Sequence, residues 1–391
     1  MAQRKVFALA NPDVVRWARE AAGFAVWDAA ENLGLPEERL EAIERGQERF
    51  TFPQLRAAAA LYKRSICVFY LAAPPDEARP VADFRRVPES EDRPISPELL
   101  LAMRRLAYKR EAAVRLIDFA APYDWSYVNS LQPGGNPEQV AAELRAALRV
   151  PPPVSLRDYD VLKVWRSAVE ARGTLVFLVR NVDVDEMRGM AIGQRPFPVI
   201  ALNRSDSPRG RLFSLVHEYV HVCLGTSSMC DDFTQDRPSK NEHEVDEIET
   251  FCNAVAAAIL MPAETVRRAR QVRGHRRGTD WTEADLVDLA LPFGVSAEAM
   301  LRRLLTLKLA TKENYVRLRR AWRSRRPPSA RDGREGGERG DVTALRTQSL
   351  PYVRLVLDAL GGEAIELADV PDLLDMKLNH LRDLEAAVAA G

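Results

Sequence analysis

The stretch from Phe213 to Gly225 constrains the fold of this chain more than any other, because it holds the pattern H-E-x-x-H within an apolar run. The run is long enough for a buried helix, and its final glycine is a typical helix stop. Residues four apart lie on one face of a helix, one turn from each other. His217 and His221 can therefore offer two imidazole nitrogens to a single metal ion. The competing interpretation is a core helix with two histidines buried by coincidence, although the chain has only five histidines.

Glu218 follows the first of these histidines directly, which suits a catalytic role. A zinc ion (Zn2+) lowers the pKa of a bound water molecule, and a neighbouring carboxylate can accept the proton. The pattern therefore predicts zinc-dependent hydrolysis with Glu218 as the general base.

Composition adds limits on partners and compartment. The chain has 391 residues, enough for two to four domains, and its 56 basic and 56 acidic residues give a net charge of zero. Zero net charge excludes a global attraction to nucleic acid or to a membrane. The four cysteines have no C-x-x-C spacing, and no run is long enough to span a bilayer. We therefore expect a cytoplasmic protein with reduced thiols and no membrane partner.

A catalytic zinc ion needs a third protein ligand, and the residues after the H-E-x-x-H pattern supply many candidates. These are Asp231, Asp232, Asp236, Glu242, His243, Glu244, Asp246, Glu247 and Glu249. A helix expected from Glu244 to Leu260 places Glu249 at the border of its apolar face, where a carboxylate needs a partner. His243 is the strongest rival because imidazole also binds zinc. The residues alone leave this choice open.

Three short strands are expected before the H-E-x-x-H helix, at residues 174–179, 187–192 and 197–203. Helical patterns fill most of the remaining chain, so the predicted fold class is α+β, mostly α. The order of helix, strands and metal-binding helix is the order that zincin-like peptidases need. The last of these strands, at 197–203, can then run beside the active-site cleft and pair with an extended substrate.

Residues 11–75 predict five short helices with glycine stops, a compact α domain with a helix-turn-helix. The runs 29–35 and 40–46 resemble the XRE family of phage-repressor-like domains in their structural positions: an alanine at the helix crossing, a glycine in the turn, and Ile-Glu-x-Gly at the end. The resemblance implies DNA binding, with Arg39 and Arg45 as candidate contacts. The alternative is a module for dimerisation or partner docking.

The DNA-facing positions of this segment depart from the XRE pattern. Val26 stands where that family often has a glutamine. The expected recognition helix presents Glu37, Glu38 and Glu41, which would repel phosphates.

The run Ile248 to Pro262 resembles the second signature of the ImmA/IrrE family of metallopeptidases, and Arg211 to His221 resembles the first. Met187-Arg188-Gly189 and Pro198-Val199-Ile200 also fit, so the resemblance covers roughly residues 150–275. It implies that His217, His221 and Glu249 bind zinc and that Glu218 is the general base.

Three further positions are interpreted through this resemblance. Asn253, one turn after Glu249, matches a position that can support a metal ligand from outside the coordination shell. Tyr219 stands where the family commonly has leucine or isoleucine. Tyr219 and His243 are candidates for the donor that stabilises the oxyanion.

The resulting organisation has six parts. They are a helix-turn-helix domain at 1–75, a connector and helix at 76–135, a zincin-like metallopeptidase core at 136–275, a helical extension at 276–322, a flexible linker at 323–342 and a C-terminal helical unit at 343–391.

The resemblance implies a zinc endopeptidase that regulates transcription by cleaving a repressor or a similar protein. DNA and a second copy of the chain are further candidate partners. The alternative is a DNA-binding transcriptional regulator, or an antitoxin-like protein, that uses a peptidase fold as a sensor or scaffold.

Overall fold

The computed structural model describes residues 6–75, 83–84, 95–150, 158–225, 242–275, 280–325 and 340–389. The chain divides into two compact units. The first comprises Met1–Pro80 with Asp92–Ala107, and the second comprises Val81–Glu91 with Tyr108–Gly391. Within the described ranges, no helix is both long and apolar enough to cross a membrane. The expected linker at 323–342 lies largely outside those ranges.

The first unit contains the five helical segments that the sequence predicts, the last as a 3-10 helix. They are α1 (Pro12–Ala21), α2 (Val26–Leu33), α3 (Glu37–Glu44), α4 (Phe52–Leu61) and η1 (Ile66–Tyr70). Asn11 caps α1 and Thr51 caps α4 through side-chain hydrogen bonds to the first turn. A buried ion pair joins α1 to α3, where Arg19 Nε donates to Glu44 Oε1 at 2.7 Å.

The second unit is built on a small sheet of four strands. They are β1 (Asp83–Phe84), β2 (Leu175–Val179), β3 (Gly189–Ile192) and β4 (Val199–Asn203), in the spatial order β1-β3-β4-β2. β2 runs parallel to β4, whereas β3 is antiparallel to both β4 and β1. The sequence predicts β2, β3 and β4 from their apolar runs, but it does not predict β1. The expectation that the last predicted strand, β4, pairs with an extended substrate is wrong, because β4 is already paired on both sides, with β3 and with β2.

Helices account for most of the second unit. In chain order they are α5 (Pro97–Arg115, which begins in the first unit), η3 (Ile117–Phe119), α6 (Pro137–Leu148), α7 (Asp158–Glu170), α8 (Pro208–Leu224), α9 (Glu242–Leu260), α10 (Ala263–Arg268), α11 (Arg270–Gly274), α12 (Glu283–Ala290), η5 (Leu291–Phe293), α13 (Ala297–Thr306), α14 (Lys312–Arg325), α15 (Gly340–Thr347), α16 (Leu350–Gly361), α17 (Val370–Leu374), η6 (Leu378–His380) and α18 (Leu381–Ala389).

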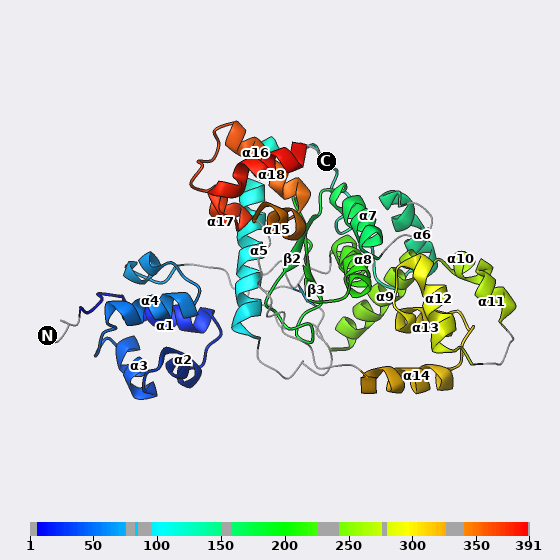
Figure 1. Cartoon of the computed structure of the whole chain (residues 1–391), viewed down its shortest axis with the longest axis horizontal. Helices are drawn as coiled ribbons and strands as arrows, with labels where there is room; N and C mark the ends of the chain where they lie inside the picture. Colours follow the sequence, from blue (N-terminus) through cyan, green and yellow to red (C-terminus); the bar gives the residue numbers. More distant parts are fainter. Residues whose placement is uncertain are drawn as a thin grey trace. The chain divides into compact units, whose positions relative to one another are not determined.

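Helix α8 is central to the second unit. It packs against α7, α9 and the strands β3 and β4, and Figure 1 shows α8 and α9 side by side next to the sheet. One continuous apolar core runs from Tyr127 to Leu318 and includes Trp281 and Leu304. Helices α12, α13 and α14 therefore share the core that holds α8 and α9 in place.

Candidate metal centre

Helix α8 has clear start and stop signals. The Ser207 side chain accepts a hydrogen bond from the Gly210 backbone, Pro208 occupies the first turn, and Gly225 ends the helix with a φ of 58°. Most of the helix is buried, including His217 at 0% exposure, Glu218 at 2% and His221 at 5%. Burial on nearly every side fixes the direction in which these three polar side chains point.

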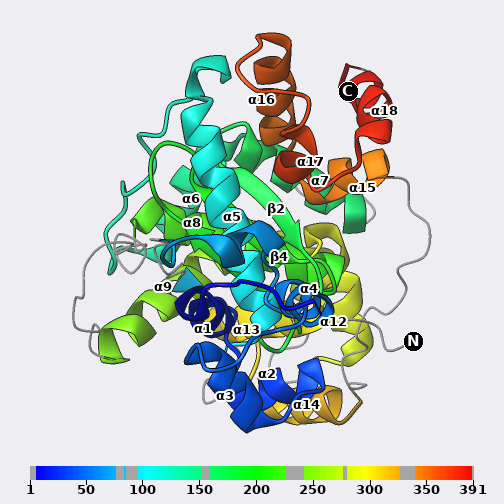
Figure 2. The ribbon, with the colours of Figure 1, turned by 90° about the vertical axis from the view of Figure 1, so that its left-hand side faces the viewer.

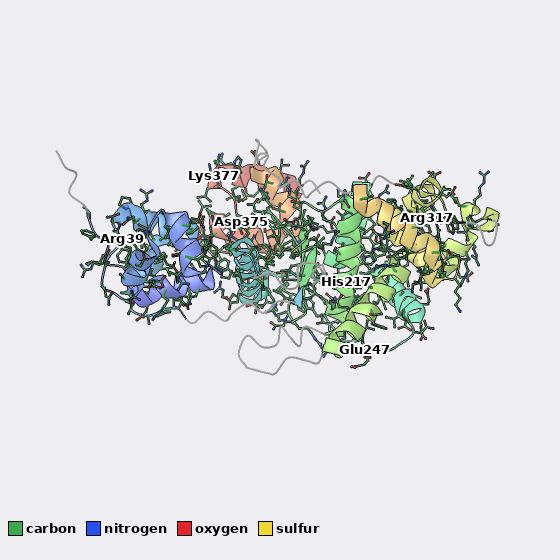
Figure 3. The ribbon with its side chains drawn as sticks, turned by 90° about the horizontal axis from the view of Figure 1, so that it is seen from below. Arg39, His217, Glu247, Arg317, Asp375 and Lys377 are labelled. Atoms are coloured by element: carbon green, nitrogen blue, oxygen red, sulfur yellow. The ribbon has the colours of Figure 1, made fainter. Side chains whose placement is uncertain are left out.

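The two histidines meet a carboxylate from the next helix. His217 Nε2 and His221 Nε2 lie 3.0 Å apart. Glu249, on α9, places its Oε2 atom 3.3 Å from His217 Nε2 and its Oε1 atom 3.0 Å from His221 Nε2. One ligand atom from each residue falls within 4.8 Å of the others, which makes this a group that could hold a metal ion. Figure 3 labels His217 on α8.

The charges in this His-His-Glu group influence one another. Burial alone would raise the pKa of Glu249, but the hydrogen bonds and charge of His217 and His221 outweigh it and hold that pKa far below its usual range. Burial lowers the pKa of His221, but hydrogen bonds to the Cys252 thiol and to Glu249 outweigh this effect and raise the pKa well above the ordinary value. A carboxylate oxygen and two imidazole nitrogens are donors that zinc binds, and a bound cation would replace the proton that these contacts favour on His221.

Glu218 lies against the first residue of β3. A Cβ atom on Gly189 would lie 2.9 Å from Glu218 Oε1 and 3.1 Å from its Cγ. The absence of a side chain at Gly189 therefore allows the strand to approach the carboxylate closely. The sequence places this glycine in the Met187-Arg188-Gly189 motif but assigns it no role. The signal for a close contact is a glycine at the start of an apolar strand.

Two residues of α9 lie near the group. Asn253 is partly buried, and its buried Oδ1 atom accepts no hydrogen bond from the described part of the chain. Cys252 is fully buried and is hydrogen-bonded to His221. The sequence predicts Cys252 only as a buried thiol, because nothing in its spacing indicates the contact with His221.

The other candidates lie elsewhere or outside the described residues. Tyr219 is completely buried, and its ring stacks on Tyr127 with centroids 5.6 Å apart. Glu247, labelled in Figure 3, is exposed on α9. The remaining candidates have side chains outside the described part of the structure; they are Asp231, Asp232, Asp236, Glu242, His243, Glu244 and Asp246.

In the first unit, the two candidate DNA contacts are each paired with a glutamate. Arg39 Nε donates to Glu48 Oε2 at 3.1 Å, and Arg45 Nη1 donates to Glu41 Oε2 at 3.2 Å. All four side chains are at least partly exposed, so these are surface ion pairs.

Two histidines one turn apart and a glutamate from the next helix form a group that could hold a metal ion, and a further glutamate lies between the histidines in the sequence. Residues 176–305 match the peptidase M78 family, which is described as the IrrE N-terminal-like domain. The chain is also similar to the radiation response metalloprotease IrrE of Deinococcus deserti, with 30% identity over 128 residues.

That alignment covers 30% of this chain and 44% of the relative, so the chain spans less than half the length of the protein it matches. The family match includes β2 from its second residue, β3, β4, α8 and α9, and therefore all the residues of the His-His-Glu group and Glu218. It confirms the resemblance for the peptidase segment. The resemblance of the first unit to the XRE family stays a prediction.

Proposed function

We propose that this chain is a zinc-dependent endopeptidase in which His217, His221 and Glu249 hold the ion and Glu218 is the general base. The observation that carries the proposal is the convergence of the three ligand atoms within 4.8 Å, from two helices that are packed together. Two imidazoles and one carboxylate are a ligand set of catalytic zinc sites that keep one position open for water.

The chemistry follows from the positions of these side chains. A zinc ion held by His217, His221 and Glu249 would supply an activated water molecule and a Lewis acid for the scissile carbonyl. Glu218 would act as the general base and then as the proton donor to the leaving amine. Gly189 lets strand β3 lie against the Glu218 carboxylate, which limits the conformations that the base can adopt. The hydrogen bond to Cys252 helps to fix the ring of His221.

We infer that the substrate is a protein, such as a repressor whose cleavage changes transcription. This part of the proposal rests on the family match of residues 176–305 and on the helical first unit. The alternative, a DNA-binding regulator with the peptidase fold as a scaffold, has less support. Its two candidate contacts, Arg39 and Arg45, lie among acidic residues and are paired with two of them.

Metal analysis combined with a substrate trap tests the proposal. The wild-type protein and Glu218→Gln are expected to hold about one zinc ion per chain, because Glu218 is not a ligand, whereas Glu249→Ala loses zinc. Glu218→Gln should also retain an uncleaved protein partner that the wild type cuts. Substoichiometric zinc that is unchanged by Glu249→Ala would exclude the ligand set. Retained cleavage by Glu218→Gln would exclude the mechanism.

A further inference from the structure

The two edges of the sheet in the second unit are closed in different ways. At the β2 edge, Arg166 Nη2 donates to the main-chain oxygen of Val176 at 2.8 Å and also to the main-chain oxygen of Gln348. Helices α15 and α16 pack on β2, and Figure 2 shows them, with α17 and α18, gathered next to this part of the sheet. The β2 edge is therefore closed by packed helices and by a partly buried guanidinium group.

The opposite edge, along β3, is covered by a much smaller element. Strand β1 pairs with it through two residues, Asp83 opposite Ala191 and Phe84 opposite Met190. These partners follow directly after Gly189, the residue that lies against Glu218. β1 therefore occupies the sheet edge immediately next to the candidate general base.

An exposed strand edge binds extended polypeptides through main-chain hydrogen bonds, largely independently of their sequence. The edge of β3 that points away from β4 would have this property, but over Met190 and Ala191 this edge is paired with β1. A pairing of two residues provides few hydrogen bonds, each with a small net contribution to stability. A segment held this weakly can be exchanged for a longer strand.

We propose that β1 is a built-in competitor of the substrate: it pairs with the edge of β3 that an extended polypeptide needs, so that polypeptide binding requires the displacement of Asp83 and Phe84. This regulation acts on the site of the proposed peptidase and rests on that function. In the resting protein, pairing with β1 lowers the apparent affinity for an extended polypeptide, because only the fraction of molecules with a free β3 edge can bind it.

The test uses proline substitutions, because proline lacks the backbone N–H group that a ladder needs. Asp83→Pro/Phe84→Pro removes the backbone N–H group of β1 that faces β3, whichever of the two residues carries it, while Asp83→Ala/Phe84→Ala changes the same side chains and keeps the backbone. Both are made in the Glu218→Gln background, so that binding is measured without cleavage. The probe is fluorescein-labelled, reduced and carboxymethylated α-lactalbumin, which stays unfolded, and its Kd is measured by fluorescence anisotropy.

We expect the proline variant to bind this probe about tenfold more tightly than its parent, and the alanine variant to bind like the parent. Hydrogen exchange should be faster in the proline variant only, at the one of Met190 and Ala191 whose amide points to β1. Equal Kd values in all three proteins, or unchanged exchange in the proline variant, would overturn the inference.

Cleavage of the same probe by the zinc-loaded proteins with Glu218 intact separates this inference from the proposed function. Tighter binding by the proline variant without cleavage by any protein supports the role of β1 and contradicts the peptidase assignment. Cleavage without any change in binding supports the peptidase assignment and contradicts the role of β1.

Discussion

Gly189 lies so close to Glu218 that a Cβ atom at position 189 would approach the Oε1 atom of the carboxylate to 2.9 Å. Real Cβ atoms essentially never come this close to another atom, so Gly189→Ala must move either the strand or the carboxylate. A displacement of about 1 Å can cost on the order of a hundredfold in rate. We expect kcat/KM of the peptidase to fall by about ten- to a hundredfold, while zinc content, measured by atomic absorption, stays at the wild-type value.

Gly361→Ala is the matched control for this prediction. A Cβ atom there would meet nothing within 4 Å, at the end of helix α16 in the same unit. This variant should keep wild-type activity. Equal activity of the Gly189 and Gly361 variants would show that the contact with Glu218 does not position the base.

Removing the charge of Glu249 should weaken metal binding. Glu249→Gln keeps the size of the side chain but loses the anionic oxygens that lie 3.0 and 3.3 Å from the two histidines. Loss of a residue outside the coordination shell typically costs about 10- to 100-fold in metal affinity, so loss of a ligand should cost at least about 100-fold. Competition with a zinc-sensitive chelator measures this change. Glu247→Gln, an exposed position on the same helix, should leave the affinity unchanged.

The buried lysine at position 109 is expected to anchor the C-terminal helices. Lys109 is 4% exposed, and its Nζ atom donates to Gln348 Oε1 at 2.6 Å and to Asp375 Oδ2 at 2.5 Å. Lys109→Met leaves these acceptors without their donor, at a cost of about 1–3 kcal/mol in the free energy of unfolding. Urea denaturation of the full chain provides the measurement. The exposed Lys377 is the control, and Lys377→Met should change stability by less than about 0.5 kcal/mol.

Glu170 should make the stability of the second unit depend on pH. Burial raises the pKa of this carboxyl group, and Arg166 and Ser349 offset the effect only in part. With a folded-state pKa above the unfolded value, the native state binds more protons between the two, so its stability falls as pH rises through that interval. Glu170→Gln removes the titrating group. The stability of the wild type relative to this variant should therefore decrease as pH rises from about 4.5, the ordinary glutamate value.

Unfolding in urea at a series of pH values measures that difference. Glu247→Gln again serves as a control, because Glu247 is exposed whereas Glu170 is buried. A difference between wild type and Glu170→Gln that is constant with pH would contradict the raised pKa.

The sequence predicts those parts of the site that lie within single elements. The histidine spacing on α8 follows from helix geometry, and the apolar runs predict β2, β3 and β4. Glu249 was one of nine candidates on residue chemistry alone, because the choice depends on how α9 packs on α8. The contact between Gly189 and Glu218 joins a strand to a helix, and local patterns carry no information about such distances.

Strand β1 lies beyond sequence reasoning for a related reason. It has only two residues, within a polar and proline-rich stretch, so no alternation of apolar and polar residues could develop. The ion pairs of the first unit show the same limit. The pairing of Arg45 with Glu41 follows helix spacing, whereas that of Arg39 with Glu48 depends on how the chain continues after α3.

Helix α3 is expected to contribute little to DNA binding. Glu37 and Glu38 are exposed on it and Glu41 is partly exposed, whereas the nearby cations Arg39 and Arg45 are both paired with glutamates. Surface ion pairs are individually weak, so the balance of charge decides, and it is negative along this helix. A DNA-binding helix instead needs cations that displace counterions from phosphates.

Arg39→Ala/Arg45→Ala should therefore change the Kd for a mixed-sequence DNA duplex by less than about threefold at roughly 150 mM salt, and the slope of log Kd against log salt should stay the same. An arginine that neutralises a phosphate contributes about one to that slope. Glu37→Gln/Glu38→Gln/Glu41→Gln should strengthen DNA binding, because it removes the repulsion and frees Arg45. Fluorescence anisotropy over a salt series measures both effects. A duplex that the wild type binds tightly and the arginine variant does not would establish α3 as a DNA-contacting helix.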